Sequence, residues 1–133
     1  MANYLLDTNH ASTLVTLSNS LRHRILDAIQ QGDRFSVCVP VVCEVWQGIS
    51  LLPRALANQT EWGKIRAGLG FFQLFEEDAK TAAELQVSLR KQGWQLGTID
   101  ALIAAIALRY DLILLTSDKD FSAVPNLKTD NWR

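Results

Sequence analysis

Cysteine and histidine are scarce in this sequence of 133 residues, which has two of each. Cys38 and Cys43 lie among apolar neighbours without the C-x-x-C spacing of a zinc or redox motif, so we expect two reduced thiols in the core. His10 and His23 are too few and too scattered for a zinc site. These shortages argue against a disulfide-stapled fold and against a zinc enzyme.

Long apolar runs, a basic leader and glycine-rich loops are missing as well. No run approaches the roughly 20 apolar residues of a membrane-spanning helix. The start, Met1 to Asp7, lacks the basic residues of a secretory signal, so we expect a cytoplasmic protein. The lack of a glycine-rich phosphate-binding loop excludes a P-loop enzyme. The length suits one core, and residues 1–133 are expected to form a single domain.

Neither sign of charge is in excess. The formal net charge is −1, and the basic residues are spread along the whole chain. Charge alone therefore gives little indication of a nucleic-acid partner. A hydrophobic content of 48% with 20% charged residues is typical of a globular chain.

Short apolar runs alternate with segments of helical periodicity. This alternation predicts an α/β fold in which helices cover both faces of a parallel sheet. The expected strands are residues 3–6, 34–39, 73–75, 112–115 and 127–131. The expected helices are a first one ended by Gly32, then 41–51, 58–71, a helix capped by Asp78 that runs to Gly93, and a central helix capped by Thr98.

One carboxylate stands at the start of the central helix. Gly97 breaks the preceding segment, Thr98 is expected to cap the helix with its hydroxyl, and Asp100 falls in the first turn. Residues 101–108 are all apolar, which is typical of a helix buried on nearly every side. Asp100 is therefore expected where a buried helix opens toward a cleft.

Other acids occupy comparable positions elsewhere in the chain. Asp7 ends a short apolar run near the start, and Glu44 is the one charge within another apolar run. Asp118 follows the most apolar expected strand, and Asp120 comes two residues later. The carboxyl ends of parallel strands and the helix starts beside them converge on one crevice, so we expect these acids to meet Asp100.

Carboxylates gathered in one crevice repel one another, so they either take up protons or bind a cation. Ligands that offer only oxygen favour hard ions, which predicts Mg²⁺ or Mn²⁺ rather than zinc. A phosphodiester is the natural substrate, because such an ion neutralises charge on phosphate oxygens and lowers the pKa of a bound water. Glu44, which comes from a helix and not from a strand end, is expected to orient the attacking water.

Four segments together resemble the motifs of PIN-domain ribonucleases, above all those of the VapC-type toxins of toxin–antitoxin pairs. They are residues 5–9 (Leu-Leu-Asp-Thr-Asn), 43–49, 97–104 and 115–121. The resemblance implies a three-layer α/β/α fold with a central, mainly parallel five-stranded sheet. It also implies Mg²⁺- or Mn²⁺-dependent cleavage of RNA, a homodimer, and a cognate antitoxin that inserts a segment near the active cleft.

The resemblance also assigns roles to individual residues. The acidic quartet of the family is matched by Asp7, Glu44, Asp100 and Asp118, of which Asp7, Asp100 and Asp118 would hold the metal. Supporting positions are matched by Thr8, Asn9 and Thr116. Asp118 and Asp120 compete for the fourth acidic role, and we favour Asp118 because it lies nearer the strand end. The loop 93–96 lacks the Arg-Pro that often follows the glycine in this family.

Simpler explanations exist for single residues. Asp100 alone fits an acid that complements the helix dipole, and residues 7–9 fit a helix cap as well as they fit a ligand role. The alternatives for the whole protein are a housekeeping RNA-processing nuclease of the same type and a non-catalytic module that binds RNA or protein. A phosphatase of the haloacid dehalogenase type is excluded, because it requires a second acid where Asn9 stands.

Overall fold

A five-stranded sheet with strand order β3-β2-β1-β4-β5 forms the centre of the computed structural model, which describes residues 1–133. The strands are β1 (Asn3–Leu6), β2 (Arg34–Cys38), β3 (Gly70–Phe72), β4 (Ile113–Leu115) and β5 (Lys128–Asp130). All four neighbouring pairs are parallel. The prediction of a parallel five-stranded sheet is confirmed.

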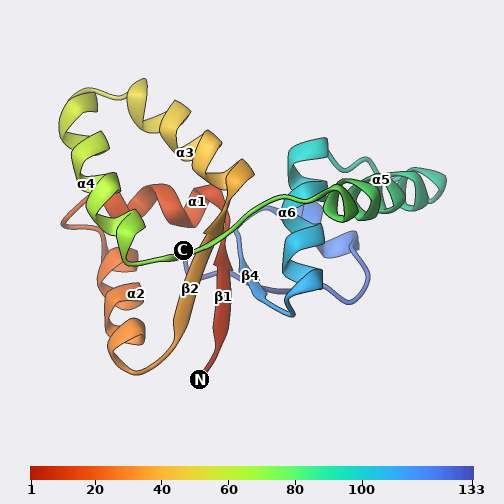
Figure 1. Ribbon diagram of the computed structural model, residues 1–133, viewed down its shortest axis with the longest axis horizontal. Helices are drawn as coiled ribbons and strands as arrows, with labels where there is room; N and C mark the ends of the chain where they lie inside the picture. The colour runs from red at the N-terminus through yellow and green to blue at the C-terminus, as the bar shows by residue number, and fades with distance from the viewer.

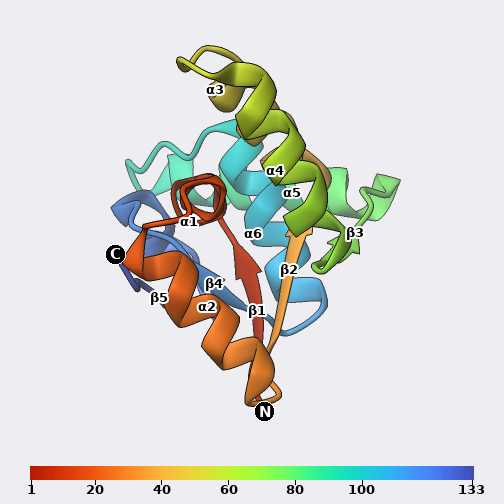
Figure 2. The same cartoon turned by 90° about the vertical axis from the view of Figure 1, so that its left-hand side faces the viewer.

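Helices cover both faces of this sheet, as the three-layer α/β/α prediction requires. They are α1 (Thr8–Ala11), α2 (Ser20–Gln30), α3 (Val39–Ser50), α4 (Ala55–Ala67), α5 (Glu76–Lys91) and α6 (Thr98–Arg109), with 3₁₀ turns η1 (Ser12–Val15) and η2 (Lys119–Ala123). One side of the sheet carries α1, α2 and α4, and the other carries α5 and α6 (Figure 1). Figure 2 shows the first group in front of β1 and β2.

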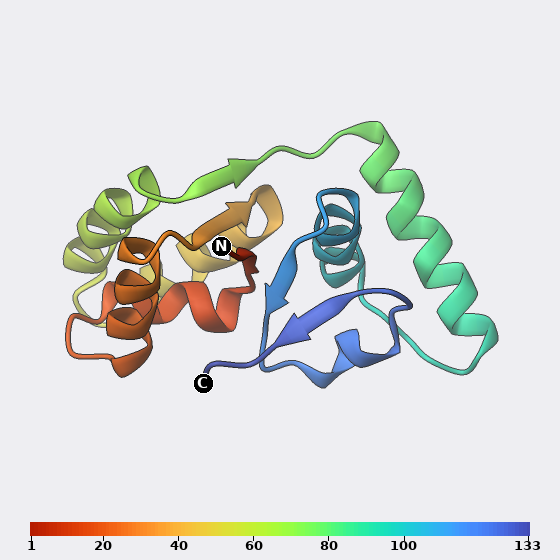
Figure 3. The ribbon, with the colours of Figure 1, turned by 90° about the horizontal axis from the view of Figure 1, so that it is seen from below.

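The strand order places a crevice beside β1. From β1 the chain moves outward through β2 to β3, and it then crosses through α5 and α6 to return as β4 on the other side of β1 (Figure 3). The order of the strands therefore reverses between β1 and β4, and ligands of open α/β sheets bind outside the carboxyl ends of the strands at such a point. Asp7 directly follows β1, and Thr116 directly follows β4.

The central helix is buried as the sequence predicts. Most of its side chains beyond the first turn lie in the core, and its alanines allow close packing between the sheet and α5. Leu5 of β1 and Leu114 of β4 are fully buried in the same core cluster as this helix. The start of α6 is thereby fixed relative to the strand ends. None of the helices is both long enough and apolar enough to span a membrane.

The prediction of a strand at 73–75 after a helix at 58–71 is wrong. The helix α4 ends at Ala67, and the strand β3 is Gly70–Phe72. Gly68 ends the helix, and Gly70 lies so close to Ser36 of β2 that a Cβ at this position would come within 2.5 Å of the serine Oγ. Phe72 fits a helical stripe in the sequence, but it pairs with Cys38 in the sheet.

Three predicted boundaries at helix starts are also wrong. Val39 begins α3 rather than ending β2, because Pro40 fits the first helical turn, where its missing N–H breaks no hydrogen bond. The N-cap of α5 is Phe75 and not Asp78. The Asp78 carboxylate lies in the first turn and accepts a hydrogen bond from the Phe75 N–H at 2.9 Å. Thr98 is the first residue of α6, whose N-cap is Gly97 with no side-chain hydrogen bond.

The two cysteines differ in their surroundings. Cys38 is buried at the end of β2, as predicted, whereas Cys43 is exposed on α3, so the prediction of two core thiols is wrong for Cys43. The reason is the helical periodicity of α3, in which Val41, Val45 and Ile49 face the core and Cys43 lies on the opposite side.

Candidate active site

Asp7 is a buried carboxylate at the end of β1. Its side chain is 5% exposed, and its backbone N–H donates to the Leu115 carbonyl of β4 at 3.0 Å. Its carboxylate accepts hydrogen bonds from Thr8 N at 2.8 Å, from Asn9 Nδ2 at 3.2 Å and from Thr116 Oγ1 at 2.6 Å. Burial raises the pKa of Asp7, and the hydrogen bonds from Thr116 and Thr8 oppose that shift. Asp7 also caps α1, so the helix-cap role and a ligand role coexist.

The Thr116 hydroxyl links the first acid to the last. It donates to Asp7 Oδ2 and accepts a hydrogen bond from the Asp118 N–H at 3.0 Å. Asn9 closes the same turn, because its Oδ1 accepts from the Ser117 N–H at 3.1 Å. The ends of β1 and β4 are therefore held together by side chains, and this fixes where Asp118 leaves the sheet.

Glu44 enters the crevice from α3 and is half-buried. The Thr8 hydroxyl donates to Glu44 Oε1 at 2.7 Å, which ties α3 to the start of α1. Oε2 makes no hydrogen bond within the chain. One oxygen of Glu44 is therefore positioned by the protein while the other is available to a water or a ligand.

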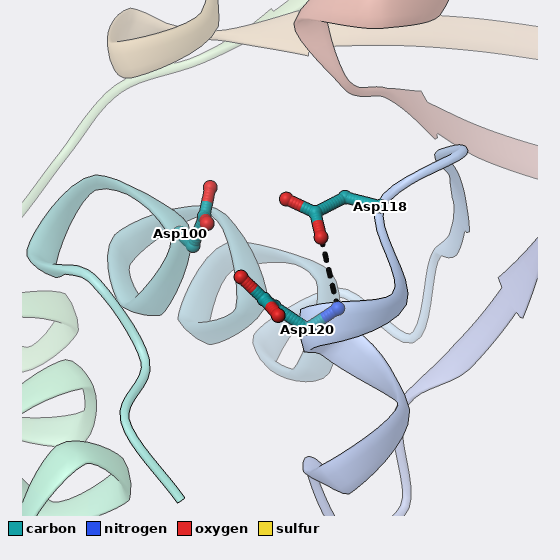
Figure 4. Close-up of side chains that lie close together, drawn as sticks. All are labelled: Asp100, Asp118 and Asp120. Carbon is teal, nitrogen blue, oxygen red and sulfur yellow. Dashed lines mark hydrogen bonds between the residues drawn. The ribbon is translucent and has the colours of Figure 1, made fainter.

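Three acids form a compact group that we call the acidic trio: Asp100, Asp118 and Asp120. Each offers one carboxylate oxygen, and these oxygens all lie within 4.8 Å of one another (Figure 4). Asp100 comes from the first turn of α6, whereas Asp118 caps η2 by accepting the Asp120 N–H at 2.9 Å. Asp100 and Asp118 are half-buried, and Asp120 is exposed.

Burial and the repulsion among neighbouring acids both disfavour negative charge in the crevice. The pKa of Asp100 is raised from 3.8 to about 6, first by burial and then by the charges of Asp7, Asp118, Glu44 and Asp120. The charges of the other four predicted acids therefore all act on Asp100. Asp7 does not belong to the acidic trio, but its charge is the first of the four that act on Asp100.

The chain does not neutralise these charges itself. Its ion pairs lie elsewhere and join Arg22 to Glu61, Arg109 to Glu77 and Asp78, and Lys128 to Asp111. Converging carboxylate oxygens without a histidine, a cysteine thiolate or a basic partner are suited to a hard divalent cation. The donor set therefore fits Mg²⁺ or Mn²⁺.

The raised pKa of Asp100 predicts a pH-dependent loss of stability. The folded state binds the Asp100 proton more tightly than the unfolded state does, so stability is lost as the pH rises from about 4 through about 6. Without divalent cations, the Asp100→Asn variant is expected to be more stable than the unmodified protein at pH 8 by about 1–2 kcal/mol, after allowance for solvent screening. Urea unfolding at pH 8 and pH 4 measures this, and an equal difference at both pH values would contradict it.

The sequence does not identify one buried residue of this region, His10. His10 is fully buried on α1, and its Nδ1 lies 2.6 Å from Asn9 Oδ1. In the sequence it is one of two scattered histidines, which fit no zinc site. Its position directly after Asn9 is the one feature of the sequence that places it near the site, and this feature is weak evidence for a role.

The chain also matches known proteins along nearly its whole length. The PIN domain family pattern matches residues 4–127. Ribonuclease VapC2 of Rickettsia felis is 26% identical over 97% of both chains. Among solved structures, the fold is similar to that of VapBC2 from Rickettsia felis bound to a DNA fragment from its promoter (TM-score 0.86, 23% identity, 98% and 99% of the two chains). It is also similar to that of DNA-bound VapBC from Salmonella typhimurium (TM-score 0.85, 18% identity, 100% of both chains).

The family pattern covers both strands that flank the crevice and every acid in it. The strand order, the burial of Asp7 and the acidic trio agree with this match. The resemblance inferred from the four sequence motifs is confirmed. The chain belongs to the PIN domain family.

Proposed function

We propose that this protein is a metal-dependent endoribonuclease that acts as the toxin of a type II toxin–antitoxin system. The observation that carries the proposal is the set of converging carboxylates that no basic side chain of the chain neutralises. The relative from Rickettsia felis is named a ribonuclease, and the similar solved structures contain VapBC complexes. A cognate antitoxin and a second copy of this chain are the proposed protein partners.

The proposed ligands of the cation are Asp7, Asp100 and Asp118, with Asp120 as the competitor of Asp118. When bound, Mg²⁺ or Mn²⁺ would neutralise charge on a phosphate oxygen and lower the pKa of a water molecule. The chain supplies the rest. Thr116 and Asn9 hold the Asp7 carboxylate by hydrogen bonds, and Asp118 is fixed by its cap on η2.

Glu44 is the proposed general base. Thr8 holds its Oε1, so Oε2 can accept a proton from a water that attacks the phosphorus atom. The raised pKa of Asp100 means that this acid takes up protons below about pH 6, so both cation binding and cleavage are expected to weaken there.

The fourth acidic role is predicted to belong to Asp118. The charge of Asp118 acts on both Asp7 and Asp100, whereas that of Asp120 acts on Asp100 alone and comes last among the four. We expect Asp118→Asn to lower the cleavage rate by about a hundredfold and Asp120→Asn by about tenfold or less. Asparagine at position 118 retains an oxygen that can accept the Asp120 N–H, so η2 should stay folded. Equal losses, or a larger loss for Asp120→Asn, would reverse the assignment.

The function is tested with purified protein and structured RNA in the presence of Mg²⁺ or Mn²⁺. Endonucleolytic fragments with defined 5′ ends are the expected products. The toxin role is tested by expression in cells, where growth arrest should accompany RNA cleavage and co-expression of the antitoxin should prevent both. Cleavage without growth arrest would favour a housekeeping RNA-processing nuclease, and RNA binding without cleavage would favour a non-catalytic module.

A further inference from the structure

His10 is fully buried and does not belong to the acidic trio. Each of its ring nitrogens has a hydrogen-bond partner. Its Nε2 lies 3.0 Å from the backbone nitrogen of Trp132, next to the end of the chain. Its Nδ1 lies 2.6 Å from Asn9 Oδ1. The ring therefore connects the C-terminal segment (residues 131–133) to the residue that holds Asp7.

The contact with Trp132 determines the tautomer of His10. A backbone N–H can only donate, so Nε2 must be the acceptor, and the neutral ring then carries its proton on Nδ1. Burial lowers the pKa of His10 to about 4, which keeps the ring neutral near neutral pH. The Nδ1–H consequently donates to Asn9 Oδ1.

The orientation of the Asn9 amide follows from this tautomer. Its Oδ1 accepts from His10 Nδ1 and from the Ser117 N–H, so its Nδ2 faces acceptors, namely Asp7 Oδ2 at 3.2 Å and Thr116 Oγ1 at 3.4 Å. A flipped amide would place its NH₂ group against two donors and its oxygen against the Asp7 carboxylate. The donors on His10 and Ser117 together disfavour the orientation in which Asn9 repels Asp7.

Aromatic packing fixes the distal end of this chain of hydrogen bonds. The Trp132 ring contacts Tyr4 of β1 at a centroid distance of 5.1 Å and Phe35 of β2 at 5.7 Å. The guanidinium of Arg24 lies over the same ring at 3.9 Å from its centroid. Arg133 donates to the Asn9 carbonyl at 3.2 Å. The C-terminal segment is therefore held against the strand that ends on Asp7.

We propose that His10 is a positioning residue of the active site, and that the hydrogen-bonded series from Trp132 through His10 and Asn9 to Asp7 orients the first metal ligand. The C-terminal segment is then part of the support of the catalytic site. This inference rests on the proposed function, because it assigns Asp7 to the cation. It predicts that the affinity for the cation depends on a donor at position 10 that never touches the cation.

Two substitutions separate the two hydrogen bonds of His10. In His10→Asn the amide nitrogen of the new side chain takes the place of Nδ1, so this variant retains the donor to Asn9. In His10→Gln the longer side chain places its amide at the position of Nε2, so this variant retains only the contact with Trp132. We expect His10→Gln to bind Mn²⁺ about tenfold more weakly, with a similar fall in kcat and an unchanged KM for RNA. His10→Asn should remain within about threefold of the unmodified protein on the same scale. His23→Gln, which changes the exposed histidine of α2, is the matched control.

The measurements are Mn²⁺ titration calorimetry, single-turnover cleavage, and ¹⁵N NMR of the histidine ring. The NMR spectrum of the unmodified protein should show His10 as the Nδ1–H tautomer, and it requires neither a variant nor activity. An Nε2–H tautomer, or equal Mn²⁺ affinities of the two His10 variants, would overturn the inference. Failure of the unmodified protein to bind Mn²⁺ or to cut RNA, with the expected tautomer present, would instead overturn the proposed function.

Discussion

Asp100→Asn and Asp7→Asn are each expected to lower RNA cleavage by about a thousandfold, which corresponds to a loss of several kcal/mol of transition-state stabilisation. Each change removes one negative charge from the proposed cation site while the shape of the side chain is kept. Asp100→Asn is the cleaner test, because the Asp100 carboxylate makes no hydrogen bond within the chain, whereas Asp7 accepts three. Cleavage of structured RNA by purified protein measures the effect.

Asp27→Asn is the matched control for these variants. Asp27 is an exposed acid on α2, which lies on the opposite face of the sheet from α6. It takes part in none of the ion pairs. This variant should cut RNA like the unmodified protein. Cleavage at an undiminished rate by a folded Asp100→Asn protein would contradict the assignment of the site.

Removal of divalent cations with EDTA is expected to abolish cleavage, and addition of Mg²⁺ or Mn²⁺ in excess should restore it. The cations should also stabilise the folded state, by about 2.7 kcal/mol at a free concentration one hundred times the Kd. The reason is that burial and the neighbouring acids both disfavour the charged form of Asp100, and a positive charge in the crevice offsets these effects. Thermal unfolding with and without Mn²⁺ measures this stabilisation.

Two comparisons make the metal experiment specific. The Asp100→Asn variant should gain little stability from Mn²⁺, because one ligand charge has been removed. Asp27→Asn should gain as much as the unmodified protein. Unchanged cleavage in EDTA, or equal stabilisation of the Asp100→Asn and unmodified proteins, would show that the acids do not act through a bound cation.

The sequence was sufficient to predict that Asp100 and Asp118 lie close together. Asp7 and Asp118 follow buried apolar strands, and Asp100 starts a helix that is apolar on every side, so each position is specified by local pattern. The rule that parallel strands present their carboxyl ends at one edge then brings these acids together. Glu44 could be included because it is the one charge in its segment.

Two features that the sequence did not predict depend on contacts between distant residues. The strand β3 has three residues and is defined by its pairing with β2, where Gly70 packs against Ser36. Periodicity cannot assign so short a run, because Phe72 fits a helix as well as a strand. The role of His10 depends on Trp132, which is 122 positions away in the chain. No local pattern encodes such a contact.

A crystal grown with Mn²⁺ and measured at the manganese absorption edge tests the central claim most directly. The predicted result is an anomalous peak bounded by carboxylate oxygens of Asp7, Asp100 and Asp118, with the Asn9 amide nitrogen still directed at Asp7. The contradictory result is a crevice without a peak at saturating Mn²⁺, in which these carboxylates are turned away from one another into solvent.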